Sequence, residues 1–182
     1  EKWLSTAGGL AGILGVALIS QSQLGMTGSA SIIASMGSSA VLLFAVPHGP
    51  LSQPWSVYGG HLVSAIVGVT CVKLIPAPML AAAIAVALVI GAMHYLRCIH
   101  PPSGATALGA VLGGDAVHQL GYQFVITPVM LNAITILLVA FLFNAAFGWR
   151  RYPAAWSGGA GAKPPAAATA KGMPLMESAD GR

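Results

Sequence analysis

Formal charges are almost missing from a long central part of this sequence. Between positions 4 and 147 the charged residues are Lys73, Arg97 and Asp115, and each lies near a Pro, Gly or His at the end of an apolar run. The whole chain is 56% hydrophobic and 7% charged, whereas a soluble domain carries about 25% charged residues. A chain with so few charged residues cannot form the polar surface that a protein needs in water. The sequence therefore predicts a protein embedded in lipid.

The apolar runs predict the number and length of the helices. A helix needs about 20 residues to cross a bilayer and roughly 17 at the least, so the runs at 4–20, 57–75, 79–96 and 124–147 can span, whereas those at 32–46 and 104–112 are too short. The predicted fold is an all-α membrane protein. It is a helical bundle of four long transmembrane helices plus two short helices that are re-entrant or half-length.

The two short runs resemble each other and suggest an internal repeat. Aligning Gly37 with Gly104 sets an offset of 67 (104 − 37) and places Ser39 on Thr106. The chain then divides into two pseudo-repeats of long, short and long helices, an arrangement common in transporters. Three crossings per unit would make the repeats inverted and two would make them parallel, and the charges leave both open.

The ends of the chain predict its domain limits and its location. We expect a transmembrane domain at 1–152 and a disordered cytoplasmic tail at 153–182, because the tail is rich in Ala, Gly and Pro without a periodic apolar face. Arg150 and Arg151 flank the last apolar run and favour a cytoplasmic end. The predicted location is the cell membrane, multi-pass, which is the inner membrane in a bacterium. The first residue is Glu1 rather than Met, which is compatible with a preceding segment.

A His-Pro-Pro sequence holds the most informative group of polar residues. Two prolines stop the preceding helix and pre-set the start of the next one, so we expect a helix to begin at Ser103 or Gly104. Its free N–H groups, with the positive end of the helix dipole, would favour a small anion. The candidate residues are Arg97, His100, Pro101, Pro102, Ser103, Gly104 and Thr106.

The first short run offers a matching turn without proline. Gly37, Ser38 and Ser39, with Ser35 before them, would form a second helix entrance that faces the first across the repeat interface. The alternative is that Gly, Ser and Ala merely let helices pack closely, as small residues do in membrane bundles.

Polar residues inside the long runs are a second kind of evidence, because they are costly in hydrocarbon and face the bundle interior. His61 lies three residues before Ser64, and Asn132 three before Thr135. For both, pathway lining and an interhelical hydrogen bond are equally supported.

The sequence contains no pattern that indicates an enzyme. Asp115 is the one acidic residue between Glu1 and Glu177, and neither the histidines nor Cys71 and Cys98 show metal-ligand spacing. We therefore expect no catalytic residues, no metal and no cofactor, and two free thiols.

Three blocks in the sequence closely resemble the HPP family of integral membrane proteins, which is named for its His-Pro-Pro motif. They are ASMGSSAVLLFAVPHGPLSQPW, GGHLVSAIVGV and HPPSGATALGAVLGG. The resemblance covers positions 4–149, and Ser103 stands where relatives often have Gly or Ala. It implies a bundle usually described as four membrane-spanning helices and a relationship to a plant chloroplast nitrite transporter.

The resemblance and the polar turns together predict a small transporter or channel for a small anion such as nitrite. The alternative is a non-transporting membrane subunit or scaffold that packs in a homo- or hetero-oligomer. The expected partners are the lipid bilayer, the anion and further copies of the chain in a homo-oligomer. Nucleic acid is not expected, because the excess of positive charge is the membrane-flanking basic end.

Overall fold

A computed structural model describes residues 1–150 and 152–154, and for 24–29 it describes the backbone alone. The tail expected at 153–182 therefore lies almost wholly outside the described residues. Within them every regular element is a helix, as predicted. The elements are α1 (Lys2–Ala45), η1 (Pro50–Ser52), α2 (Pro54–Leu74), α3 (Pro78–Tyr95), α4 (Ser103–Leu112), α5 (Asp115–His118), η2 (Val125–Met130) and α6 (Leu131–Ala145).

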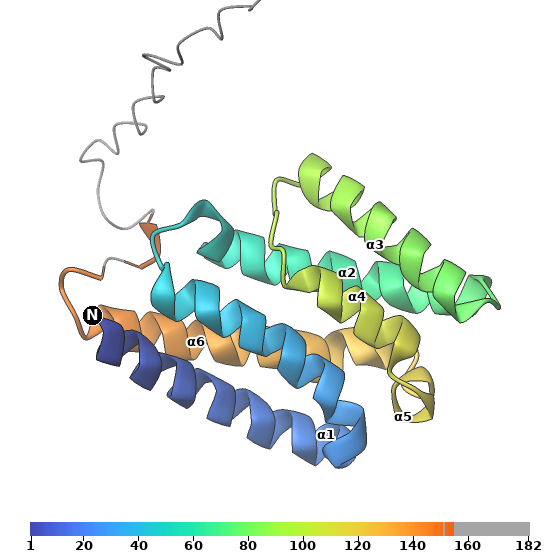
Figure 1. The fold of residues 1–182 in the computed structure, drawn as a ribbon, viewed down its shortest axis with the longest axis horizontal. Coiled ribbons are helices and arrows are strands. Elements are labelled where there is room, and N and C mark those ends of the chain that lie inside the picture. Colours follow the sequence, from blue (N-terminus) through green and yellow to red (C-terminus); the bar gives the residue numbers. More distant parts are fainter. Residues whose placement is uncertain (151, 155–182) are drawn as a thin grey trace, which may run out of the picture.

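Helix α1 folds back on itself as two antiparallel arms (Figure 1). The first arm is Lys2–Gln23 and the second is Ala30–Ala45. A side-chain carbon at Gly12 would lie 2.7 Å from the Phe44 ring. A straight helix would separate these positions by about 48 Å, at 1.5 Å per residue. The chain therefore reverses between Gln23 and Ala30, and the glycine lets the two arms touch.

Several turns of the chain lie at the same end of the bundle, where hydrogen bonds connect segments that are distant in sequence. We call this end the N-terminal face. Both chain ends of the described bundle, the loop before α2 and the end of α3 meet there. The bonds are Arg150 Nε to Glu1 Oε1 at 2.9 Å, Tyr152 Oη to Ser52 O at 3.0 Å, and Trp55 Nε1 to Leu96 O at 3.1 Å.

The other side, which we call the opposite face, holds the end of α2 and the connection after α4. Lys73 Nζ lies 5.7 Å from the centre of the Tyr122 ring, and the Thr70 and Tyr122 hydroxyls are 3.0 Å apart. The chain thus passes between the two faces six times, at 2–23, 30–45, 54–74, 78–95, 97–112 and 125–145. Each short segment leads from one face to the other, so two units of three such passes would be inverted. The duplication itself stays a prediction.

The long helices lie close to the predicted runs. Helices α2 and α3 both carry Pro in their first turn, where its missing N–H costs nothing. The last predicted helix is interrupted, because Thr127 is extended (φ −132°, ψ 118°) before Pro128. A residue that precedes proline is disfavoured in the helical region, and α6 begins only at Leu131.

The prediction that a helix begins at Gly37 is wrong, because the second arm is helical throughout 30–45. Ser38 and Ser39 donate to the carbonyls of Ala34 and Ser35, one turn earlier, at 3.3 and 3.2 Å. These bonds are compatible with a helix. A single glycine costs a helix only about 1 kcal/mol, which tertiary packing outweighs.

Small residues bring α2 and α4 into close contact. A side-chain carbon at Gly60 would lie 2.5 Å from Ser103 Oγ, and one at Gly68 would lie 2.8 Å from the Ala107 carbonyl oxygen. Close helix packing through small residues is the usual arrangement within membranes. The packing role weighed above therefore applies to these glycines.

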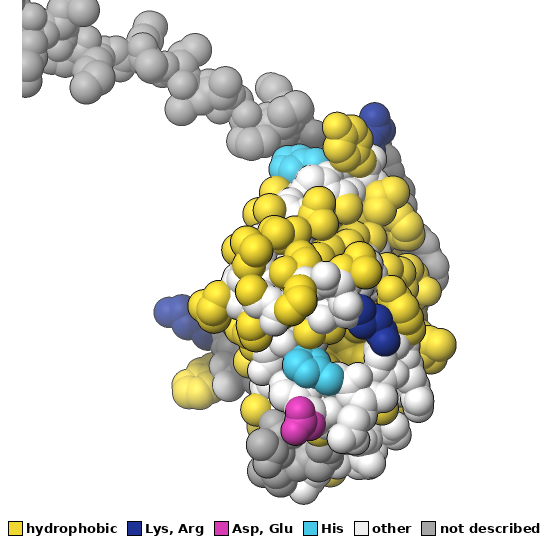
Figure 2. Space-filling view, turned by 90° about the vertical axis from the view of Figure 1, so that its right-hand side faces the viewer, with side chains coloured by type: hydrophobic (Ala, Val, Ile, Leu, Met, Phe, Trp, Pro, Cys, Tyr) yellow, Lys and Arg dark blue, Asp and Glu magenta, His cyan; other side chains and the backbone are white. Residues whose placement is uncertain are grey.

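The exterior of the bundle is apolar. Leu10, Leu14 and Leu18 follow one another at four-residue spacing on the first arm and are 63%, 54% and 69% exposed. Four segments are long and apolar enough to span a membrane: Lys2–Gln23, Pro54–Leu74, Pro78–Tyr95 and Val125–Ala145. Figure 2 looks onto the opposite face, where an acidic side chain and a histidine lie beneath a broad apolar surface.

Candidate functional site

Five polar side chains meet inside the bundle, and we call this group the polar centre. Each is at most 1% exposed. They come from the second arm of α1, from α2, and from the His-Pro-Pro turn together with α4, which follows it directly. The residues are Ser35, Ser39, His61, His100 and Thr106.

His61 links three of these segments. Its Nε2 atom lies 3.0 Å from the Ser39 hydroxyl and its Nδ1 atom 2.8 Å from the Thr106 hydroxyl. Its ring is 5.1 Å from the ring of His100, centre to centre, in an edge-to-face arrangement. Both ring nitrogens are therefore engaged, and the imidazole is fixed in orientation.

His100 connects the polar centre to the N-terminal face. Its Nδ1 atom lies 2.8 Å from the carbonyl oxygen of Leu51 in η1, and its Nε2 atom 2.9 Å from the Ser39 hydroxyl. A carbonyl oxygen only accepts, so Nδ1 carries the hydrogen and donates it. In the neutral ring Nε2 is then an acceptor, and it shares the single hydrogen of the Ser39 hydroxyl with the Ser35 carbonyl oxygen, which lies 3.2 Å from Ser39 Oγ.

Ser35 closes the other end of the polar centre. Its hydroxyl lies 2.7 Å from the Thr106 hydroxyl and 3.0 Å from the Pro102 carbonyl oxygen, to which it can donate. The second arm and α4 are therefore joined at two places along their contact. The sequence predicts a turn at Ser35, whereas Ser35 lies within a helix and faces α4.

The His-Pro-Pro turn places His100 and Thr106 on the same side of the chain. Helix α4 follows it directly, with Pro102 as its N-cap residue. The first N–H groups of α4 are not free, because those of Ser103 and Gly104 donate to the carbonyls of His100 and Pro101 at 2.9 and 3.1 Å. The expectation that these N–H groups offer a binding site for an anion is therefore wrong.

The polar centre lies within the length of a spanning helix. His61 is the eighth residue of α2, which has 21 residues, so it lies about 10 Å along the helix at 1.5 Å per residue. Polar groups at such a depth are costly unless they bond to one another. The five side chains meet this requirement through their mutual hydrogen bonds.

Two further hydroxyls are buried near the polar centre. Ser64 lies one turn after Gly60 on α2, and Ser103 lies against Gly60. The Oγ atoms of both serines have no hydrogen-bond partner among the described residues. They are spare donors beside the bonded group.

Other predicted residues lie outside the polar centre. Asn132 is buried and donates to the Ser20 hydroxyl at 2.7 Å, so it joins α6 to the first arm. Arg97 is exposed in the turn after α3, with φ 53°. Gly37 lies beside a groove between the arms of α1, and Gly104 lines a groove against α3.

Ser38 and the first proline of the motif line a third groove. Ser38 is exposed and faces Pro101 and Pro102 across the space between the second arm and α4. Pro102 lines this groove, and its carbonyl oxygen accepts a hydrogen bond from Ser35 of the polar centre at 3.0 Å.

Two features of the site had no sequence signal. The Leu51 carbonyl belongs to the backbone, so no residue type marks its role. Arg150 was expected as a membrane-flanking charge, yet its side chain is 1% exposed. It pairs with Glu1 and donates to the Ser5 hydroxyl and the Phe44 carbonyl, which joins both arms of α1 to the end of the bundle.

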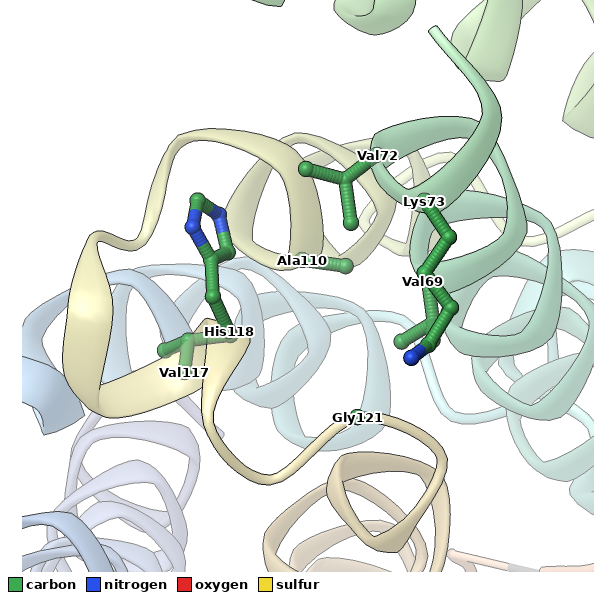
Figure 3. Close-up of a pocket in the computed structure, with 7 residues that line it drawn as sticks. All are labelled: Val69, Val72, Lys73, Ala110, Val117, His118 and Gly121. Atoms are coloured by element: carbon green, nitrogen blue, oxygen red, sulfur yellow. The ribbon is translucent and has the colours of Figure 1, made fainter. Parts of the chain in front are cut away.

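A separate cavity of about 150 Å³ opens at the opposite face (Figure 3). Lys73 and Val69 of α2 form one wall, and His118 of α5 forms the other, with Ala110 of α4 between them. The His118 Nε2 atom donates to the Val111 carbonyl at 2.9 Å. This cavity and the polar centre lie at opposite ends of α4.

The fold and the exterior define a multi-pass, all-α membrane protein in contact with lipid. The family model for the HPP transmembrane region matches residues 1–153. The chain belongs to the HPP family.

Two curated relatives are transmembrane proteins of Dictyostelium discoideum. Each is 37% identical to this chain, over 159 and 158 residues, which is 85% of this chain and 50% and 54% of the relatives. The chain thus spans about half the length of the curated relatives it matches. None of the solved structures matches it.

Proposed function

We propose that this chain is a small transporter or channel for a small anion such as nitrite, and that the anion passes at the polar centre. The observation that carries the proposal is a hydrogen-bonded group of five buried polar side chains inside an apolar bundle. Buried polar residues in membrane proteins are costly, and they commonly mark substrate or ion pathways.

The chemistry of the polar centre favours an anion over a cation. Its side chains are hydroxyls and imidazoles, which donate hydrogen bonds, and Ser64 and Ser103 add two spare hydroxyls. The acidic residue nearest in sequence is Asp115, nine positions after Thr106 and at the far end of α4. A bent anion with two acceptor oxygens, such as nitrite, can accept from the Ser64 and Ser103 hydroxyls, and from the five residues of the polar centre when these exchange their mutual bonds for bonds to the anion.

The charges favour one orientation in the bilayer. Lys2, Arg97 and Arg150 belong to the N-terminal face, whereas Lys73 lies at the opposite face with Asp115. By the positive-inside rule the N-terminal face is cytoplasmic. We therefore propose a cell-membrane location, which in a bacterium is the inner membrane.

The test is nitrite uptake into proteoliposomes that contain the purified chain. We expect uptake above that of protein-free vesicles, and a large loss when His100→Ala and Thr106→Val are combined. Asn132→Ala is the matched control, since it also removes a buried polar group but one outside the polar centre. Uptake unchanged by the double substitution would overturn the assignment of the site.

The second candidate is a non-transporting subunit that packs against further copies or a partner. The tight contacts of Gly60 and Gly68 with α4 favour it, because they close the bundle along that interface. No flux of any small anion or cation from the chain reconstituted alone, together with cross-linked oligomers in the membrane, would support this candidate. In neither candidate function does the chain catalyse a reaction of the anion.

A further inference from the structure

The cavity at the opposite face is lined by a lysine whose charge is not paired. Lys73 is exposed in the last turn of α2, and its Nζ atom has no ion-pair or hydrogen-bond partner among the described residues. This atom lies 5.7 Å from the centre of the Tyr122 ring, and a side-chain carbon at Gly121 would lie 3.5 Å from it. The amine is therefore directed along the wall of the cavity toward the 121–122 segment (Figure 3).

Capping of α2 does not account for the position of this lysine. A lysine in the last turn of a helix can stabilise the free carbonyls there, but the Nζ atom of Lys73 lies against another segment of the chain. Gly121 has a φ of 52° and no side chain, so it leaves the amine uncovered. Lys73 therefore offers the cavity a positive charge and three hydrogen-bond donors.

The other wall of the cavity does not oppose an anion with a negative charge. His118 donates to the Val111 carbonyl at 2.9 Å, so this carbonyl near the end of α4 is already bonded. Asp115 begins the same short helix as His118 but does not line the cavity. Among the lining residues the formal charge is thus the single positive charge of Lys73.

The size of the cavity limits the ligand to a small ion. Its volume is about 150 Å³, whereas sites for drug-sized organic molecules measure about 300–1,000 Å³. A water molecule needs about 10–15 Å³ of such volume, so the cavity holds a small anion together with several waters. Apart from the lysine and the histidine, the lining residues are valine, alanine and glycine.

The cavity lies on the same side of two helices as the polar centre. Val72 lines the cavity and follows His61 by eleven residues, or about three turns of α2, so both side chains face the same way. On α4, Ala110 of the cavity follows Thr106 by one turn, about 6 Å. Val69 lies between His61 and the end of α2 and is 2% exposed. An apolar constriction of this kind closes a pathway to ions by excluding water.

We propose that this cavity is the entry site for the anion at the opposite face, and that Lys73 binds the anion there before it reaches the polar centre. The inference rests on the proposed function, because it names the mouth of the same passage. A positive charge at the mouth of a pathway raises the local concentration of anions and speeds their capture. Its loss therefore slows uptake at low nitrite concentration and leaves the rate at saturation nearly unchanged.

The first test measures binding without transport. The full chain in detergent is treated with an acetylating reagent over a range of sodium nitrite concentrations, and the acetylation of each lysine is followed by mass spectrometry. Sodium gluconate keeps the ionic strength constant, because this organic anion is too large for the cavity. Lys2 of the N-terminal face is the internal control.

We expect nitrite to slow the acetylation of Lys73 and not that of Lys2. The rate at Lys73 should fall about fivefold when nitrite reaches about four times its dissociation constant. An acetylation rate of Lys73 that is the same with and without nitrite would overturn the entry site.

The second test changes the charge at position 73 during transport. Proteoliposomes that contain Lys73→Cys are treated from outside with a membrane-impermeant methanethiosulfonate that attaches either a trimethylammonium or a sulfonate group. These reagents reach only the molecules whose opposite face lies outside. Gln23→Cys is the matched control, because Gln23 is exposed at the same face and does not line the cavity. Wild type, whose two cysteines are buried, gives the background.

We expect the cationic group at position 73 to give faster initial nitrite uptake than the anionic group, by about fivefold or more below saturation. The two rates should converge at high nitrite, and Gln23→Cys should respond to neither reagent. Saturable uptake that is independent of the charge at position 73 would overturn the entry site and leave the proposed function standing. Protection of Lys73 by nitrite in a chain that transports no nitrite would support anion binding in the cavity and overturn the proposed function.

Discussion

The Nδ1 atom of His61 lies 2.8 Å from the hydroxyl of Thr106. This contact joins α2 to α4 through two side chains that are each at most 1% exposed. It also sets the donor pattern of the remaining polar centre, because the other nitrogen of His61 bonds to Ser39. A single hydroxyl therefore affects both the stability of the bundle and the proposed passage.

Thr106→Val is expected to destabilise the protein. The substitution keeps the shape of the side chain but leaves His61 Nδ1 and the Ser35 hydroxyl without this partner. A buried polar group left unpaired costs about 1–3 kcal/mol. The measurement is the thermal unfolding midpoint in detergent, with Thr106→Ser as the matched control. A midpoint equal to that of wild type would contradict the contact.

Gly68→Ala is expected to push α2 away from α4. The new carbon would lie 2.7 Å from Ala110 Cβ and 2.8 Å from the Ala107 carbonyl oxygen, and the backbone there cannot move aside cheaply. Overpacking of this kind costs about 1–3 kcal/mol. The unfolding midpoint should fall.

Gly91→Ala on α3 is the control for that substitution. Nothing lies within 4 Å of a carbon added at Gly91, and alanine favours a helix over glycine by about 1 kcal/mol. The Gly91 variant should be as stable as wild type or more stable. If both alanine variants change stability equally, the close packing of α2 on α4 is wrong.

Asn132→Ala separates a structural polar contact from the proposed passage. Asn132 donates to Ser20 at 2.7 Å and does not bond to the polar centre. Interhelical hydrogen bonds in membranes contribute about 0.6 kcal/mol on average. We expect a small loss of stability and nitrite uptake close to wild type. A loss of uptake as large as that of the His100 and Thr106 double variant would place Asn132 in the passage.

The ion pair of Glu1 with Arg150 predicts a pH dependence. A hydrogen bond from Trp149, and then one from Arg150, holds the pKa of the Glu1 carboxyl below its ordinary value of 4.5, although burial opposes the shift. Because the folded-state pKa is lowered, the contact stabilises above the pKa of the unfolded carboxyl. That contribution is lost as the pH falls through the folded-state pKa.

The measurement is the unfolding midpoint of wild type and Glu1→Gln across the acid range. Wild type should be the more stable at neutral pH, and the difference should disappear in acid. A difference that stays constant over the whole range would mean that the carboxylate does not contribute through this pair.

The spanning helices could be predicted because run length and proline position are local properties. Helix α2 begins at Pro54 and α3 at Pro78, close to the expected starts. The break expected at Gly37 failed because glycine and serine are weak signals, and packing of the second arm against α4 outweighs them. The two arms of α1 match the predicted runs at 4–20 and 32–46, but the contact between Gly12 and Phe44 joins positions far apart in sequence and has no local signal.

The polar centre could be predicted only in part. His61, His100 and Thr106 are polar residues in an apolar sequence, so composition alone marks them. Their partners are set by tertiary structure, since Ser35 and Thr106 lie 71 positions apart. No rule of local sequence pairs residues at such a separation, and the Leu51 carbonyl has no signature at all.

The most direct test of the central claim is the initial rate of nitrite uptake by the purified chain in proteoliposomes, measured over a range of nitrite concentrations. The account predicts a saturable rate above that of protein-free vesicles, lowered about tenfold or more by His100→Ala with Thr106→Val, since both ends of the polar centre then lose a bond. A rate no higher than that of protein-free vesicles, for a chain that is folded and inserted, would contradict it.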